Sequence, residues 1–308
     1  MNNVILLLAG TLMHATPLLF AALGGVISES SGVMNIALEG VMTFGAFTGA
    51  AVAYASNSSW LGFFIAGLAG ALLISLHAVA SVTFRADQTI SGTAINFLGP
   101  GLSLLLAKKM FNGSALSPTA PKLPILFPKN LTERWQGTPF ENLNISVGVV
   151  IAFALVLLIW FLFYHTKWGL RILATGQHPA AVDTLGVNVY VMRYICVICS
   201  GMLAGFGGAF MSLSVTSSFS PSTVCGQGFI ALAAVIFGKW TPHGVMLSCL
   251  LFGFAKECTT ILGGEGTFIP PVLLEMFPYV LTILVLVLFV GKSSVPKANG
   301  VPYLRGAR

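Results

Sequence analysis

The chain has 308 residues, of which 56% are hydrophobic and only 8% are charged, and its formal net charge is +6. Soluble domains carry about 25% charged residues, so this composition excludes a soluble globular protein and indicates an integral membrane protein. The spans are expected to be helices, because the apolar segments lack the alternating pattern of an outer-membrane barrel. The basic residues fall mainly near the ends of these segments, where membrane topology explains them without nucleic-acid binding.

The hydropathy pattern predicts an all-α, polytopic bundle of about eight to ten transmembrane spans, forming one domain over residues 1–308. The N-terminal apolar segment has no charged region or cleavage site, so we expect a retained span and not a signal peptide. Pro100 is expected to kink or break the fourth span. The first four expected spans are 4–27, 34–55, 61–84 and about 90–111.

A polar stretch with several prolines, residues 112–144, follows and is expected to form the longest loop. Beyond it, a shorter apolar segment at 229–237 is too short to cross the ~30 Å hydrocarbon core as a straight helix. Residues 166–190 and 291–308 are polar, and we expect them to be a loop and a tail. The remaining expected spans are 145–164, about 190–213, 245–262 and about 273–290.

The positions of lysine and arginine predict the orientation. With nine crossings, the 166–190 loop and the tail share one side, which also collects most of the basic residues and is therefore cytoplasmic. The basic residues near the 112–144 loop weigh little against this orientation, because long loops translocate with little regard to charge. The residues on the cytoplasmic side are Arg85, Lys167, Arg171, Arg193, Lys239, Lys292, Lys297, Arg305 and Arg308.

The 166–190 loop carries a short helical signal. Pro179 suits the first turn of a helix, and Gly186 suits the stop after its last turn. A short helix held between two spans is placed to contact something outside the bilayer.

Four polar residues within the apolar spans are candidates for a translocation pathway. Glu39 is a charge in an apolar span, which costs at least about 2.5 kcal/mol on insertion scales and demands a cavity or a partner. Asn35 shares a helix face with Glu39, and Thr93 lies three residues before Asn96. A sugar or nucleoside needs such donors and acceptors in transit. The alternative is hydrogen bonding to neighbouring helices, and for Glu39 we favour a structural role at the start of a half-helix.

Other patterns indicate structure and not chemistry. Lys256 and Glu257 are adjacent, so they do not face each other on a helix. We expect either that each has a separate partner or that Lys256 snorkels, and we favour a structural role. Cys196 and Cys199 form a CxxC inside a span, where packing is favoured over zinc or redox chemistry. Residues 35–39 and 229–233 share a short core, which hints at an internal repeat. We predict no catalytic residue and no metal site.

Several ordered blocks of this chain resemble ABC importer permeases for simple sugars and nucleosides. The polar loop and the next span read GLRILATGQHPAAVDTLGV and, further on, SGMLAGFGG. The others are GGVISESSGVMNIALEGVMTFGAF near the start, ADQTISGTAINFL at 86–98, GQGFIALAAVIFGKWTPHG at 226–244, and the end of the chain, PYVLTILVLVLFVGKSSVPKANGVPYLRGAR. Together they cover most of the sequence.

This resemblance implies a permease subunit that forms a nucleoside pathway with a second, paralogous permease in the bacterial cytoplasmic membrane, surrounded by lipid. Transport would be ATP-driven alternating access, with ATP and Mg on a partner ATPase and no cofactor on this chain, which is then not an enzyme. A periplasmic or lipid-anchored binding protein would deliver the substrate. The short helix would dock on the ATPase, through Gly176, Gln177, His178, Pro179, Ala180, Ala181, Asp183, Thr184, Leu185 and Gly186.

Three alternatives remain open from the sequence. A simple-sugar permease of the ribose or galactose type fits the same blocks. Ser30 and Gln227 stand where ABC importer permeases for simple sugars and nucleosides usually have arginine, so the substrate preference of this chain is expected to differ from that of close relatives. An ion-coupled secondary transporter would need no docking helix and would use intramembrane acids, of which Glu39 is the only attractive one. A structural membrane protein would need no polar residues facing a pathway.

Overall fold

The computed structural model describes residues 2–127, 145–263 and 295–305, with five isolated residues between 276 and 287. Within these ranges the regular structure is helical, apart from one antiparallel bridge between Ile125 and Ser146. The predicted all-α fold class is therefore confirmed. The predicted last span at 273–290 and the middle of the 112–144 loop lie largely outside the described residues.

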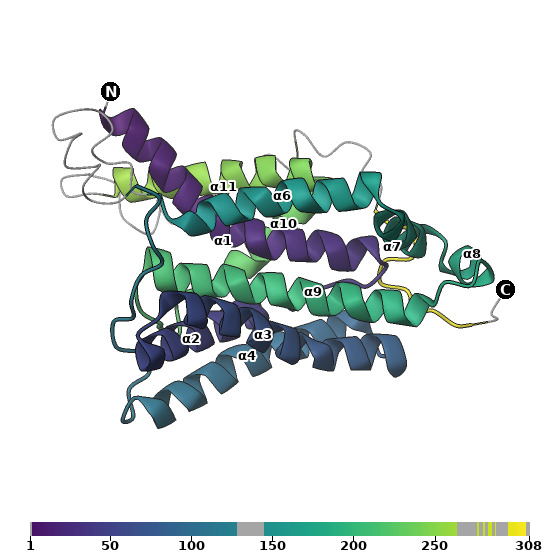
Figure 1. Cartoon of the computed structure of the whole chain (residues 1–308), viewed down its shortest axis with the longest axis horizontal. Coiled ribbons are helices and arrows are strands. Elements are labelled where there is room, and N and C mark those ends of the chain that lie inside the picture. The colour runs from purple at the N-terminus through teal and green to yellow at the C-terminus, as the bar shows by residue number, and fades with distance from the viewer. Residues whose placement is uncertain are drawn as a thin grey trace.

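The helices pack side by side as a bundle (Figure 1). Two of them, α3 and α9, continue into π-helical turns, η1 (Val79–Thr83) and η4 (Met211–Val215). Of the kink or break expected at Pro100, the break does not occur, since α4 continues through this residue. The helices are α1 (Asn2–Ser30), α2 (Leu38–Ser56), α3 (Ser59–Ala78), α4 (Gln88–Met110), α6 (Val147–His165), α7 (Lys167–Gln177), α8 (Pro179–Thr184), α9 (Val189–Phe210), α10 (Gln227–Phe237) and α11 (Pro242–Leu262).

Six helices in the described ranges are long and apolar enough to cross a membrane, which makes the chain a multi-pass membrane protein. The shorter apolar segment predicted at 229–237 forms α10. The six are Val4–Ser30, Ser59–Thr83, Gln88–Met110, Val147–His165, Val189–Val215 and Pro242–Leu262.

Close packing of α9 against its neighbours depends on glycines. A Cβ added at Gly208 would lie 1.9 Å from the carbonyl oxygen of Met42, and one added at Gly70 would lie 2.3 Å from that of Gly201. Both distances are far inside van der Waals contact, so only glycine allows the backbones to approach this closely. The glycines thus bring α2 and α3 directly against α9.

Two helices begin after irregular segments. Residues 31–37 separate α1 from α2, and residues 216–226 separate η4 from α10. The sequence predicted that the second span would begin at residue 34, but α2 begins at Leu38. The side-chain oxygen of Asn35 accepts a hydrogen bond from the backbone N–H of Ala37, at 3.1 Å. This turn replaces the helical hydrogen bonds that the apolar pattern had suggested.

The two ends of the bundle differ. Figure 1 shows the N-terminus at one end, and α7, α8 and residues 295–305 at the other. The 166–190 loop and the described part of the tail, which were predicted to share the cytoplasmic side, thus lie at the same end, and Arg193 lies at that end as well. Arg193 is only 1% exposed in α9, because its guanidinium is covered by the segment 295–305.

Candidate functional site

The short helix predicted in the polar loop is present as α8. Pro179 stands in its first turn, and Gly186 follows its end with φ +79°, a backbone conformation that favours glycine. Leu185, between them, is 81% exposed. Most of the side chains predicted to dock on an ATPase are exposed as well: Gln177, His178, Ala180, Ala181, Thr184 and Leu185.

The sequence did not predict α7, a helix that precedes α8 and packs against the end of α1. The hydroxyl oxygen of Thr166 caps α7 by accepting from the N–H of Gly169. Gly176, in contrast to its exposed neighbours, is buried, and a Cβ there would lie 2.1 Å from the carbonyl oxygen of Ser30. Gly176 therefore belongs to the joint between α7 and α1 and not to the exposed surface of α8.

Residues 295–305, which we call the C-terminal strap, cross this end of the molecule. The N–H of Ala298 donates to the carbonyl oxygen of Gly176 at 2.8 Å, and Nη1 of Arg193 donates to the carbonyl oxygen of Val301 at 3.0 Å. The strap is thus bonded to α7 and to α9, and it reaches α8 a few residues later.

The end of the strap contacts α8 directly. Nε of Arg305 lies 3.2 Å from Oδ2 of Asp183, and the ring of Tyr303 packs with Val182 and Val189 in a small apolar cluster. Burial, followed by the nearby Asp183 carboxylate, raises the pKa of the Tyr303 phenol. Through these contacts the strap holds α8 in place, in addition to the connection of α8 to α7.

A buried carboxylate joins the strap to two further parts of the chain. Oε2 of Glu29, at the end of α1, accepts hydrogen bonds from Nε1 of Trp240 at 2.5 Å and from Nδ2 of Asn299 at 3.4 Å. Glu29 is 4% exposed. The carboxylate therefore connects α1, the turn between α10 and α11, and the strap.

The irregular segment before α2 is held by side-chain amides that the sequence had selected for the pathway. Asn96 of α4 donates from Nδ2 to the carbonyl oxygen of Ile36 at 2.9 Å and accepts from the N–H of Gly40 at 2.8 Å. Asn35 donates from Nδ2 to Oγ of Ser200 at 2.7 Å. Backbone groups at a helix start have no helical partner, and these amides supply one.

Glu39 connects the starts of α2 and α10, the two helices that follow irregular segments and that we call the interrupted helices. It lies in the first turn of α2, and its two carboxylate oxygens accept from the N–H groups of Gly226 and Gly228, each at 2.7 Å. A carboxylate is favourable at a helix N-terminus, where unpaired N–H groups point outward. The structure brings Glu39 and Asn96 together at the start of α2, whereas the hydroxyl of the exposed Thr93 donates to the carbonyl oxygen of Thr89.

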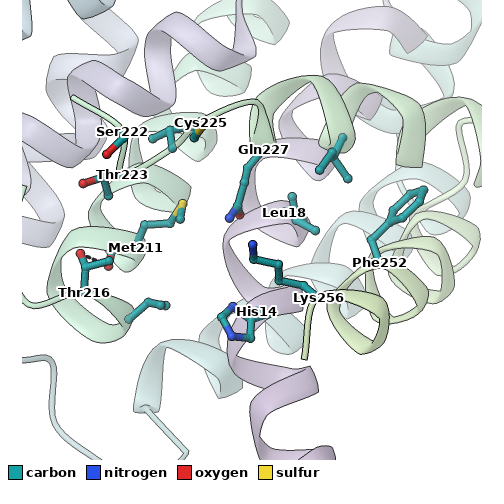
Figure 2. Close-up of a pocket in the computed structure, with 13 residues that line it drawn as sticks. His14, Leu18, Met211, Thr216, Ser222, Thr223, Cys225, Gln227, Phe252 and Lys256 are labelled. Atoms are coloured by element: carbon teal, nitrogen blue, oxygen red, sulfur yellow. Dashed lines mark hydrogen bonds between the residues drawn. The ribbon is translucent and has the colours of Figure 1, made fainter. Parts of the chain in front are cut away.

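The bundle also encloses a cavity of about 440 Å³ among α1, residues 211–227, α10 and α11 (Figure 2). The sequence had assigned a structural role to its charged residue, Lys256. As expected, Glu257 has a separate partner, Nε2 of His14 at 3.3 Å. The only sequence signal for the cavity was a charge inside a span. Its polar lining residues are His14, Thr216, Ser222, Thr223, Gln227 and Lys256.

A multi-pass helical bundle with interrupted helices, a polar cavity and a short helix held outside the spans has the architecture of a membrane transport protein. Residues 7–286 match the family described as "Branched-chain amino acid transport system / permease component", and the chain belongs to this family. It is a permease subunit, which is a membrane component and not an enzyme. No solved structure matches the chain.

Relatives match over nearly the whole sequence. The guanosine ABC transporter permease protein NupQ of Bacillus subtilis is 43% identical over 98% of this chain and 98% of its own length. The nucleoside ABC transporter permease protein NupC of Lactococcus lactis is 39% identical over 99% and 98%. A putative glucose ABC transporter permease protein, TsgC13 of Haloferax volcanii, is 32% identical over 91% and 90%. The predicted resemblance to ABC permeases is confirmed.

Proposed function

We propose that this chain is a permease subunit of a nucleoside ABC importer in the bacterial cytoplasmic membrane, where it forms the pathway with a paralogous permease. The observation that carries the proposal is the near-complete similarity, at 43% and 39% identity, to permeases named for guanosine and nucleosides. The architecture supports it, because α8 presents an exposed surface at the end of the bundle that carries the basic residues.

The proposed mechanism is alternating access driven by a partner ATPase, which binds ATP and Mg. The exposed side chains of α8 dock on that partner, and a receptor delivers the nucleoside at the opposite end. The close contact between Gly176 and Ser30 carries movement of α7 and α8 to α1. The C-terminal strap carries the same movement to α9 through Arg193. Because α1 and α9 pack centrally, a shift of α8 reaches the interrupted helices.

At the pathway, we propose that Glu39 and Asn96 shape the lining by fixing the starts of α2 and α10. Asn35 attaches the segment before α2 to α9 by donating a hydrogen bond to Oγ of Ser200. Of the four residues that the sequence predicted for the pathway, Thr93 has an exposed side chain and is the best placed to contact a solute or the second permease.

A charge on α8 tests the docking role. Ala181 is exposed on α8, and Ala55 is exposed near the end of α2, at the other end of the bundle. We expect the Ala181→Glu variant to insert into the membrane but to lose nucleoside uptake and stimulation of the partner's ATPase. The Ala55→Glu variant, with the same change, is expected to keep both. Normal uptake by Ala181→Glu would refute docking through α8.

The sugar alternative is favoured by one observation, the 32% identity to a permease named for glucose. Competition separates the two substrates: unlabelled nucleosides are expected to block uptake of labelled guanosine, and ribose and glucose are not. Uptake that needs no ATP and follows an ion gradient would instead indicate a secondary transporter.

A further inference from the structure

The cavity of Figure 2 has no part in the contacts that connect α7, α8 and the strap to the bundle. Its volume of about 440 Å³ lies within the range of about 300–1,000 Å³ of pockets that hold small ligands. The walls come from α1, the irregular segment before α10, and α11, which are far apart in the sequence but adjacent in Figure 2. The lining mixes apolar side chains with a few polar ones, which is the usual composition of a ligand site.

Lys256 supplies the charge of this cavity. It lies in α11, and in Figure 2 its ammonium group points into the cavity toward Gln227. Among the described residues it forms no ion pair, since the neighbouring Glu257 is paired with His14. A charge inside a span is costly and marks a functional site by default. An ammonium group has three donors and no acceptor, so its ligand must present an acceptor oxygen or nitrogen.

Gln227 is the second recognition group, and the fold fixes its position. It is the first residue of α10, directly between the two N–H groups that bind the carboxylate of Glu39. Its amide both donates and accepts, so it can pair with an N–H group beside a carbonyl.

The remaining walls complement these two groups. Ser222 and Thr223 lie at the side of the cavity away from Lys256 (Figure 2), where their hydroxyl oxygens lie 3.1 Å and 3.2 Å from Oγ of Ser220. Leu18 and Phe252 form an apolar wall, and Phe252 is 1% exposed and therefore rigidly packed.

We propose that this cavity binds a nucleoside whose base has a carbonyl oxygen next to a ring N–H, such as guanosine, inosine or uridine. Lys256 donates to the carbonyl oxygen, and Gln227 pairs with the adjacent N–H. Adenosine presents an amino group at that edge, which sets a donor against a donor and leaves the ammonium group of Lys256 without its acceptor. The inference rests on the proposed nucleoside function and adds to it the site and the class of base.

The test uses a thiol that the cavity already contains. Cys225 is exposed and lines the cavity, so a bound ligand is expected to shield it from a small maleimide. The full-length chain in liposomes, with the other four cysteines replaced by alanine, is labelled with and without added nucleoside. A ligand at ten times its Kd slows labelling by about tenfold, because only empty sites react.

We expect guanosine and uridine to protect Cys225 and adenosine to protect it about tenfold less well, the size of a lost hydrogen bond to a charged group. Protection is expected to disappear in Lys256→Met and to persist in Lys109→Met, a matched change of an exposed lysine at the end of α4. If Lys256→Met does not insert, Gln227→Leu is expected to weaken protection by guanosine instead.

Labelling that guanosine does not slow at any concentration would overturn the inference, as would full protection in both Lys256→Met and Gln227→Leu. Stronger protection by GMP than by guanosine would assign the cavity to a phosphate and overturn the base class. Uptake by the assembled complex separates the two proposals. Nucleoside uptake without protection refutes only the cavity, whereas protection without nucleoside uptake refutes the proposed function.

Discussion

Replacing Gly176 by alanine adds one methyl group at the joint between α7 and α1. The new Cβ would lie 2.1 Å from the carbonyl oxygen of Ser30, which is backbone and has no rotamer to change. To restore ordinary contact, α7 must move away by more than 1 Å, roughly the difference from normal van der Waals separation. That movement strains the hydrogen bond from Ala298 of the strap to the carbonyl oxygen of Gly176, 2.8 Å long.

The magnitude follows from two opposing effects. Overpacking of this kind costs about 1–3 kcal/mol, and a strained hydrogen bond adds about 0.5–1.5 kcal/mol. Alanine returns about 0.5–1 kcal/mol through its helix preference. We therefore expect Gly176→Ala to lower the free energy of unfolding by about 1–3 kcal/mol, and Tm by several degrees, on the scale of about 2–4 °C per kcal/mol.

Thermal unfolding of the purified chain and uptake by the complex measure the two consequences. The matched control is Gly101→Ala in α4, where an added Cβ meets no atom within 4 Å. We expect the control to keep the wild-type Tm and uptake, and Gly176→Ala to lose uptake more than its stability alone explains. If the two variants unfold and transport alike, the joint does not transmit movement.

Two further predictions concern the interior. Glu39→Ala leaves two N–H groups at the start of α10 without acceptors, so we expect a loss of about 2–4 kcal/mol, and Glu39→Gln, which keeps one acceptor oxygen, is expected to lose less; equal Tm values for the two variants would contradict this. Asn96→Leu removes the bond to Ile36 in the segment before α2 and the bond to Gly40 in the first turn of α2, so we expect a lower Tm and a lower nucleoside flux in the same preparation. A wild-type flux at a lowered Tm would return Asn96 to a purely packing role.

Local signals predicted the elements well. Pro179 and Gly186 determine the two ends of α8 through their own backbone preferences. The sequence of this loop alone was therefore enough to predict the helix. Apolar composition likewise identified the spans. The sequence missed α7 because residues 167–177 combine polar and apolar residues on two faces, and a polar loop was the simpler interpretation. It also placed the second span too early, since the turn at Asn35 depends on side chains from other helices.

Local sequence patterns do not predict which groups the polar residues bind, because those groups lie far away in the sequence. The sequence identified Glu39 as an intramembrane charge, but the N–H groups that it binds lie 187 and 189 residues further on. Nothing near Arg193 in the chain indicates the strap that covers it. Lys256 was assigned to structure because the cavity in front of it exists only after four segments have assembled.

The strap has a consequence for biogenesis. Arg305 lies 122 residues beyond the Asp183 that it contacts, so α8 leaves the ribosome long before its support is synthesised. Until then α8 is held by α7 and by the start of α9, where Val182 packs against Val189. A polypeptide that lacks residues 295–305 therefore lacks the contacts of Tyr303 and Arg305 that hold α8 from the strap.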